Sequence, residues 1–255
     1  MSRRIVPYVI VGIVSYLIFI VATVPAALLG TALQRASNGT LVLQALSGTA
    51  WNGRGELVLN RGHAGVHSFG QGHWSVNPLW LFTGSVRTSM KFSAPDSDIA
   101  ATVNVSPGKL SIARLQAKFS ASLVGALYAP AALVAPEGSM VLESGGLSFE
   151  KDALKGEAKL DWRNAASNLS PVKPLGDYRL SASGQGKAMQ VKMETLTGAL
   201  ALSGTGQWRT DDGRLHFDLL ANARERADEL GPLLKMIGRE QANGDRLLTI
   251  DVRLR

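Results

Sequence analysis

An uncharged N-terminal segment constrains this chain more than any other feature of its sequence. Residues 5–34 contain no Asp, Glu, Lys or Arg, and residues 5–29 are almost entirely apolar. A helix over residues 5–29 would be about 37 Å long, more than the hydrocarbon core of a bilayer at about 30 Å. Pro7 and Pro25 lie near its two ends, where a missing N–H costs least. We therefore predict a transmembrane helix over residues 5–29.

The residues that flank this segment set its expected orientation. Arg3 and Arg4 stand directly before the apolar run, and positive charge beside a span stays on the cytoplasmic side. We predict a cytoplasmic tail over residues 1–4 and a periplasmic or otherwise external domain over residues 30–255. A cleaved signal peptide is the alternative. Its apolar region is normally about 7–15 residues long, however, and no strong cleavage site of small residues follows directly.

Composition limits the chemistry that the rest of the chain can perform. The chain has no Cys, which excludes a disulfide scaffold, a thiol nucleophile, a Cys-ligated zinc site and an iron–sulfur cluster. Its 27 Lys and Arg residues outnumber its 20 Asp and Glu residues. No basic run is longer than the pair Arg3 and Arg4, so this mild excess does not indicate nucleic-acid binding.

Beyond the apolar segment, apolar and polar residues alternate with the period of half-buried β-strands. The alternation is clearest over residues 86–92, 158–162, 189–193 and 248–254. Turn sequences separate the alternating runs, and the pair Asp212 and Gly213 gives the sharpest hairpin signal. We predict a mainly β fold, with a strongly twisted, mostly antiparallel sheet that forms an open groove or a partial barrel.

Two segments depart from this pattern and are predicted to be short helices. Residues 120–128 are rich in Ala and end before Pro130. Residues 227–237 place four apolar side chains on one helical face, namely Leu230, Leu233, Leu234 and Ile237. Recurring Gly, Trp and Pro-Leu units indicate two similar halves, residues 40–150 and 151–255, within the external domain.

No arrangement of residues indicates catalysis. His63, His67 and His73 are the best candidate metal ligands, because alternate positions of one continuous strand share a face. Glycines interrupt the stretch and no carboxylate lies among the three, so a polar hairpin end is the better interpretation. No phosphate loop or nucleophile elbow is present. We predict no catalytic residue, no cofactor and no metal.

The five tryptophans are interpreted mainly as anchors of the core or of sheet edges. Trp74 and residues 80–82 form an apolar cluster around Pro78, which we expect to be an exposed patch for a partner or for the membrane surface.

Several short segments, in this order, resemble the type II (general) secretion pathway protein N family. The matching pieces are residues 48–53 (GTAWNG), Trp74 with residues 77–79 (NPL), residues 161–165 (DWRNA), residues 174–178 (PLGDY) and residues 196–198 (LTG). The resemblance covers nearly the whole chain, including the N-terminal anchor and a final helix, turn and strand. Their order and spacing carry the resemblance, since no single piece is diagnostic.

The resemblance implies a bacterial inner-membrane protein that faces the periplasm and acts as an accessory component of the type II secretion machine. It implies partners among the inner-membrane platform proteins lettered C, L and M, and it implies no enzymatic activity. A membrane-anchored periplasmic β-groove that binds lipid or envelope components, as in proteins of the AsmA group, is the alternative. An enzyme is the third interpretation.

Overall fold

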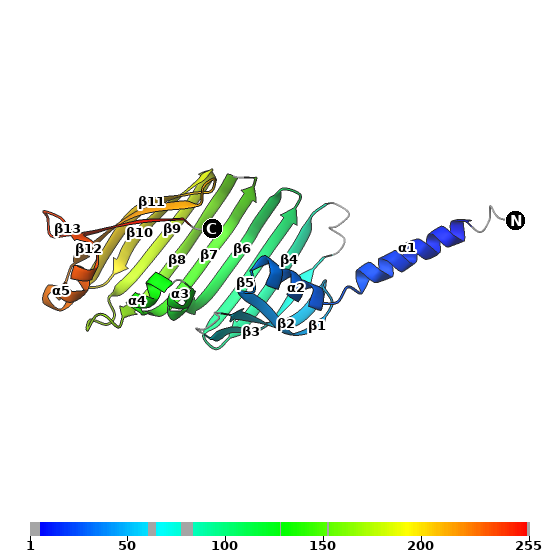
Figure 1. Ribbon diagram of the computed structural model, residues 1–255, viewed down its shortest axis with the longest axis horizontal. Helices are drawn as coiled ribbons and strands as arrows, with labels where there is room; N and C mark the ends of the chain where they lie inside the picture. The colour runs from blue at the N-terminus through cyan, green and yellow to red at the C-terminus, as the bar shows by residue number, and fades with distance from the viewer. Residues whose placement is uncertain (1–5, 61–64, 78–83, 128, 152, 254–255) are drawn as a thin grey trace. The chain divides into compact units, whose positions relative to one another are not determined.

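The computed structural model describes residues 6–60, 65–77, 84–127, 129–151 and 153–253. The chain forms two compact units, Met1–Ala94 and Pro95–Arg255, which we call the N-terminal and C-terminal units (Figure 1). Both consist mainly of antiparallel strands, so the predicted mainly β fold class is confirmed. The division of the external domain into similar halves, residues 40–150 and 151–255, stays a prediction.

The N-terminal unit contains two helices followed by four strands in chain order. The elements are α1 (Val6–Ala22), α2 (Ala27–Ala36), β1 (Leu41–Gly48), β2 (Asn52–Asn60), β3 (Val66–Val76) and β4 (Val86–Ala94). Each strand pairs antiparallel with the next. Ala26, Trp74 and Val76 form one of its buried clusters, and the Trp74 indole N–H donates to Ala50 O at 3.2 Å. Trp74 is therefore a core anchor and does not belong to an exposed patch.

The predicted helix over residues 5–29 is found only in part. α1 has 17 residues and is about 25 Å long, and the chain leaves helical geometry before α2 begins. Pro25 offers no N–H to continue the helix, and it forms an isolated β-bridge with Thr49. Ala50 N–H donates to Val24 O at 2.8 Å, which ties the same segment to the unit. Among the described residues, none of the helices combines the length and the hydropathy that a membrane span requires.

The C-terminal unit is one open antiparallel sheet with three short helices among its described residues. Its elements are β5 (Ser97–Ser106), β6 (Lys109–Ser120), α3 (Ser122–Leu127), α4 (Ala129–Val134), β7 (Pro136–Glu150), β8 (Ala153–Ser167), β9 (Gly176–Gly186), β10 (Ala188–Thr197), β11 (Leu200–Arg209), β12 (Arg214–Ala223), α5 (Ala227–Met236), β13 (Arg239–Glu240) and β14 (Arg246–Arg253). The strands follow chain order as far as β12, after which β14 lies between β12 and β13. The predicted hairpin at Asp212 and Gly213 joins β11 to β12.

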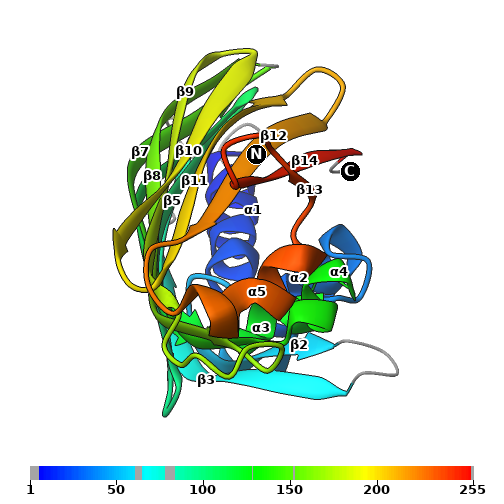
Figure 2. The ribbon, with the colours of Figure 1, turned by 90° about the vertical axis from the view of Figure 1, so that its left-hand side faces the viewer.

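The connections of this unit differ between the two ends of its sheet. In an antiparallel sheet every second connection falls at the same end. α3, α4, α5 and the loop of residues 168–175 all lie at one end, which we call the helical end (Figure 2). The connections β5–β6, β9–β10 and β11–β12 at the opposite end are tight turns of residues 107–108, 187 and 210–213.

The main core of the C-terminal unit lies at the helical end. Leu230 and Leu233 of α5 are buried against the sheet residues Tyr178, Leu200 and Leu202. The spacing of apolar residues in α5 matches the stripe predicted for residues 227–237, and burial of that stripe holds the helix on the sheet. The helix predicted over residues 120–128 is found as α3, with α4 following it.

Candidate functional site

Three of the motif segments that carry the family resemblance meet at the helical end. Asn164 N–H, at the end of β8, donates to Asp177 Oδ1 at 2.7 Å. Thr197 Oγ1, at the end of β10, donates to Asp177 Oδ2 at 3.2 Å. One carboxylate at the start of β9 therefore joins segments 161–165, 174–178 and 196–198. We call Asn164, Asp177, Tyr178, Thr197 and Gly198 the motif junction.

Glycine is required where the chain segments of the junction cross. Gly198 has φ 122°, and a Cβ on it would lie 2.2 Å from Gly176 Cα and 2.4 Å from Leu175 O. Leu200 N–H donates to Leu175 O at 3.1 Å, and Leu175 N–H donates to Ala165 O at 2.7 Å. Backbone bonds therefore pull these segments together until only a residue without a side chain fits between them.

Tyr178 packs between the motif junction and the core of the C-terminal unit. Its side chain is 2% exposed, and its hydroxyl donates to Leu200 O at 2.9 Å. Its ring lies 5.7 Å from the ring of Trp162, whose indole N–H donates to Glu137 O at 2.9 Å. Burial, and then the charge of Asp177, raise the pKa of the Tyr178 hydroxyl, so it remains a protonated donor.

On the polar face of the sheet, a charge cluster joins β8 to β9 beside the junction. Arg179 donates to both carboxylate oxygens of Asp161, at 2.7 and 2.8 Å, and Arg163 lies 3.5 Å from the same carboxylate. The bonds from Arg179, followed by its charge and by Arg163, hold the pKa of Asp161 below its ordinary value against the opposing effect of burial. This cluster fixes the register of the two strands that position the junction.

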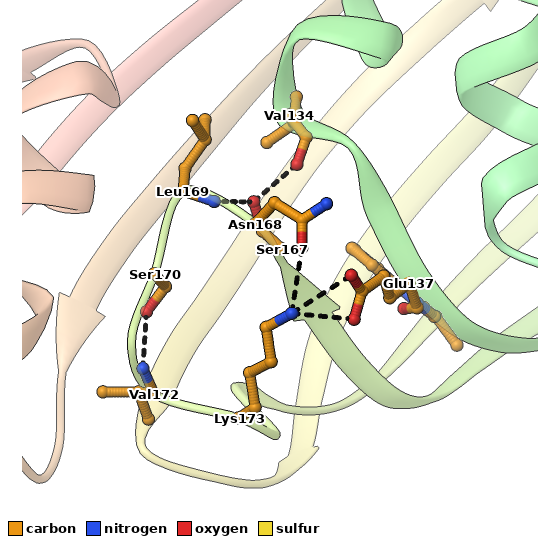
Figure 3. Close-up of polar contacts among 9 residues, drawn as sticks. Val134, Glu137, Ser167, Asn168, Leu169, Ser170, Val172 and Lys173 are labelled. Carbon is orange, nitrogen blue, oxygen red and sulfur yellow. Dashed lines mark hydrogen bonds and ion pairs between the residues drawn. The ribbon is translucent and has the colours of Figure 1, made fainter.

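The loop that leads into the junction is fastened to α4 and β7 (Figure 3). Ser167 Oγ donates to Val134 O and accepts from Leu169 N–H at 3.1 Å. Lys173 Nζ donates to the Glu137 carboxylate at 2.9 and 3.1 Å and to Asn168 Oδ1 at 3.0 Å (Figure 3). These contacts order an exposed segment, although the ion pair itself adds little to stability because its side chains are solvated.

Three large apolar side chains on α4 and on this loop lie in solvent. Leu133 is 78% exposed, Val134 41% and Leu169 36%. We call these three residues the helical-end patch. Its backbone is held through Ser167, and the pair Lys173 and Glu137 lies beside it (Figure 3). Exposed apolar side chains on an ordered backbone with polar neighbours are typical of protein-interaction surfaces.

The predicted apolar cluster and the candidate metal ligands fall partly outside the residues that the structure describes. His63 and residues 80–82 lie outside the described residues. His67 lies against Phe69 in β3, with ring centroids 5.3 Å apart, and His73 pairs with Arg54 and Lys91 across the strands. Over the described ranges of the chain, no group of His, Cys, Asp or Glu could hold a metal ion.

The helical-end patch lies outside the patterns that predict the strands and helices. The Ala-rich signal over residues 120–128 predicts only a short helix there. Leu133 and Val134 carry no period-two signal, and Leu169 lies in a loop whose order depends on long-range contacts. One sequence signal could have indicated these residues. They are large apolar residues in connections between strands, outside the alternating runs whose apolar face packs in the core.

Comparison with known proteins connects these features to a family. A family model for protein N of the type II secretion system matches residues 39–249. No curated protein and no solved structure matches the chain. The matched range contains the motif junction and the helical-end patch and extends into β14. Since the model covers most of the sequence, the chain belongs to the type II secretion system protein N family.

Proposed function

We propose that this secretion component acts by binding other proteins of the machine at the helical end of its C-terminal unit. The observation that carries the proposal is the helical-end patch, in which Leu133, Val134 and Leu169 stand in solvent on an ordered backbone. The motif junction anchors the loop behind the patch, so its geometry is fixed before a partner arrives. The expected partners are the platform proteins C, L and M, and the role is binding without catalysis.

The proposed location is the bacterial inner membrane, with the C-terminal unit in the periplasm. Residues 8–21 of α1 are all exposed and uncharged, and two arginines precede the helix. Water does not favour such a surface, whereas lipid does. In this proposal residues 5–29 attach the chain to the membrane and residues 1–4 stay in the cytoplasm. Attachment raises the effective concentration of the patch near membrane-bound partners.

The docking proposal is tested with two leucines of similar exposure. Leu169→Asp places a charge in the patch, whereas Leu220→Asp places one on β12, where the leucine is 39% exposed. Leu169→Asp should abolish co-purification with the platform proteins and reduce secretion at least about tenfold, as expected for loss of an apolar contact at an interface centre. Leu220→Asp should leave both unchanged. Normal secretion and co-purification by Leu169→Asp would refute the proposal.

Membrane attachment has its own test. Removal of residues 1–30 should release the remaining chain in soluble form from the envelope and abolish secretion. Full-length chain should resist extraction from membranes by alkaline carbonate. A mature chain that lacks its N-terminus and washes freely from cells would show that the segment is a cleaved signal.

Binding of lipid or another envelope component on the apolar face of the sheet is the second candidate function. The observation that favours it is that Leu160, Leu180 and Val191 on that face are only half-buried, with the small residues Ala158 and Ala182 between them. It ranks second because the hollow over β8–β10 is lined mostly by side chains of the polar face, including Lys159 and Lys192. Phospholipid that co-purifies with the full chain, detected by mass spectrometry, would raise its rank.

A further inference from the structure

Three basic side chains form a row across the sheet of the N-terminal unit. Arg54 of β2 lies directly opposite His73 of β3, and His73 lies directly opposite Lys91 of β4. All three are exposed, and they lie on the face of the sheet opposite to the buried Trp74. Directly opposite residues are about 5 Å apart at Cα, so the row extends over about 10 Å. We call Arg54, His73 and Lys91 the basic row.

The described residues do not balance the positive charge of this row. Neither Arg54 nor Lys91 has an ion-pair partner in the part of the chain that the structure describes. Glu56 is the nearest acidic residue along β2, and its carboxylate accepts a hydrogen bond from Ser68 Oγ instead. Protonation of His73 would place like charges directly opposite one another, which destabilises a sheet. An anion from outside the chain would remove this cost.

A hollow of about 550 Å³ opens beside Arg54 and His73. Neutral side chains with hydrogen-bond donors also line it, namely Ser47, Asn52 and Gln71. A bulge in β1 borders the hollow, because the pairing with β2 shifts between Gln44 and Ser47 and Ala45 has φ 49°. Cationic side chains beside neutral donors are the groups that bind phosphate oxygens most strongly.

The basic row lies close to the end of the proposed membrane segment. The Trp51 indole N–H donates to Val21 O at 2.6 Å, so the hairpin between β1 and β2 contacts the last turn of α1. An indole ring is well suited to the membrane–water interface. Arg54 is two residues beyond Asn52, where β2 begins, and is therefore at most about 7 Å farther from α1. The headgroup layer of a leaflet is about 5–8 Å thick, so the row can reach it.

We propose that the basic row binds the phosphate of an anionic phospholipid headgroup. This inference rests on the membrane attachment proposed above, and it adds the class of lipid and the residues that select it. Arg54 supplies a planar fork of donors and Lys91 a compact charge, with the His73 imidazole between them. Phosphatidylglycerol is favoured over phosphatidylcholine, because the choline group would bring a second cation into a basic site. The bound lipid holds the N-terminal unit against the membrane surface.

Binding is measured with the full chain in an uncharged detergent. Phosphatidylglycerol or phosphatidylcholine is titrated into the micelles, and native mass spectrometry counts the lipid that stays bound. Phosphatidylglycerol should bind at least about tenfold more tightly. Arg54→Gln and Lys91→Gln should each weaken its binding about fivefold, and the double variant about 25-fold. Arg114→Gln, which removes an exposed arginine of β6, should bind as the wild type does. Thermal unfolding shows that each variant is folded.

The inference and membrane attachment fail in different ways. A chain that washes from membranes in carbonate but prefers phosphatidylglycerol would refute attachment and support the role of the row. Equal affinity for the two lipids would overturn the inference, as would equal affinity of the wild type and the double variant for phosphatidylglycerol. Inorganic phosphate and glycerol phosphate are the soluble probes. If either binds as tightly as phosphatidylglycerol, the row is a site for a soluble anion and the assignment to lipid is wrong.

Discussion

The motif junction predicts that replacing Gly198 by Ala is more harmful than replacing another glycine of the same sheet with a similar backbone. Gly198 and Gly186 have φ values of 122° and 109°. Both substitutions therefore carry a similar conformational cost, of order 1–3 kcal/mol. A Cβ on Gly198 would also lie 2.2 Å from Gly176 Cα, whereas one on Gly186 would meet no heavy atom within 4 Å. Displacing that backbone adds about 1–3 kcal/mol.

The expected result is a difference in stability between the two variants. With about 2–4 °C of melting temperature per kcal/mol for a unit of this size, Gly198→Ala should melt several degrees below Gly186→Ala. Thermal unfolding of the full chain in detergent, followed by tryptophan fluorescence, measures it. Because the junction supports the helical-end patch, secretion should fall with Gly198→Ala and not with Gly186→Ala. Equal melting temperatures would show that the crossing at Gly198 is not tightly packed and would refute the reasoning.

Three further comparisons test other parts of the same end. Tyr178→Phe should destabilise the chain by about 1–2 kcal/mol in thermal unfolding, because a buried main-chain carbonyl loses its donor. Leu230→Ala should cost about 2–5 kcal/mol, whereas Met236→Ala on the same helix, where the side chain is 66% exposed, should change stability by less than about 0.5 kcal/mol. Arg179 holds the pKa of Asp161 below its ordinary value of 3.8, so stabilisation by this pair is complete above that pH and is lost as pH falls through the lower folded-state pKa. The stability difference between wild type and Asp161→Asn should therefore shrink on acidification from neutral to strongly acidic pH, and a constant difference would contradict this explanation.

Local patterns in the sequence were sufficient to predict most of the strands. The alternation over residues 189–193 appears in β10, that over residues 248–254 appears in β14 as far as Arg253, and most of the apolar stripe that begins at Leu230 appears in α5. Each pattern reflects burial of one face of one element, which neighbouring residues in the chain determine together. The class of the fold was therefore accessible without knowledge of any long-range contact.

The difference between the continuous helix predicted over residues 5–29 and the observed α1, which ends at Ala22, has the opposite origin. Hydropathy describes the composition of that segment, but its helix ends where Val24 and Pro25 pair with residues of the hairpin between β1 and β2. Those contacts join positions about 25 residues apart in the sequence. The same limitation applies to the candidate site, because Asp177 receives bonds from Asn164 and Thr197. Sequence order indicated these motifs, but not that one carboxylate joins them.

The connections between strands differ in length at the two ends of the C-terminal unit, and this difference explains why we expect partner proteins to bind at only one end. Antiparallel pairing sends every second connection to the same end, and the tight turns at residues 107–108, 187 and 210–213 leave room for little except the reversal of the chain. The longer connections at the helical end can carry helices and an exposed loop without disturbing the strand register. A partner surface can therefore vary there while the geometry of the sheet stays the same.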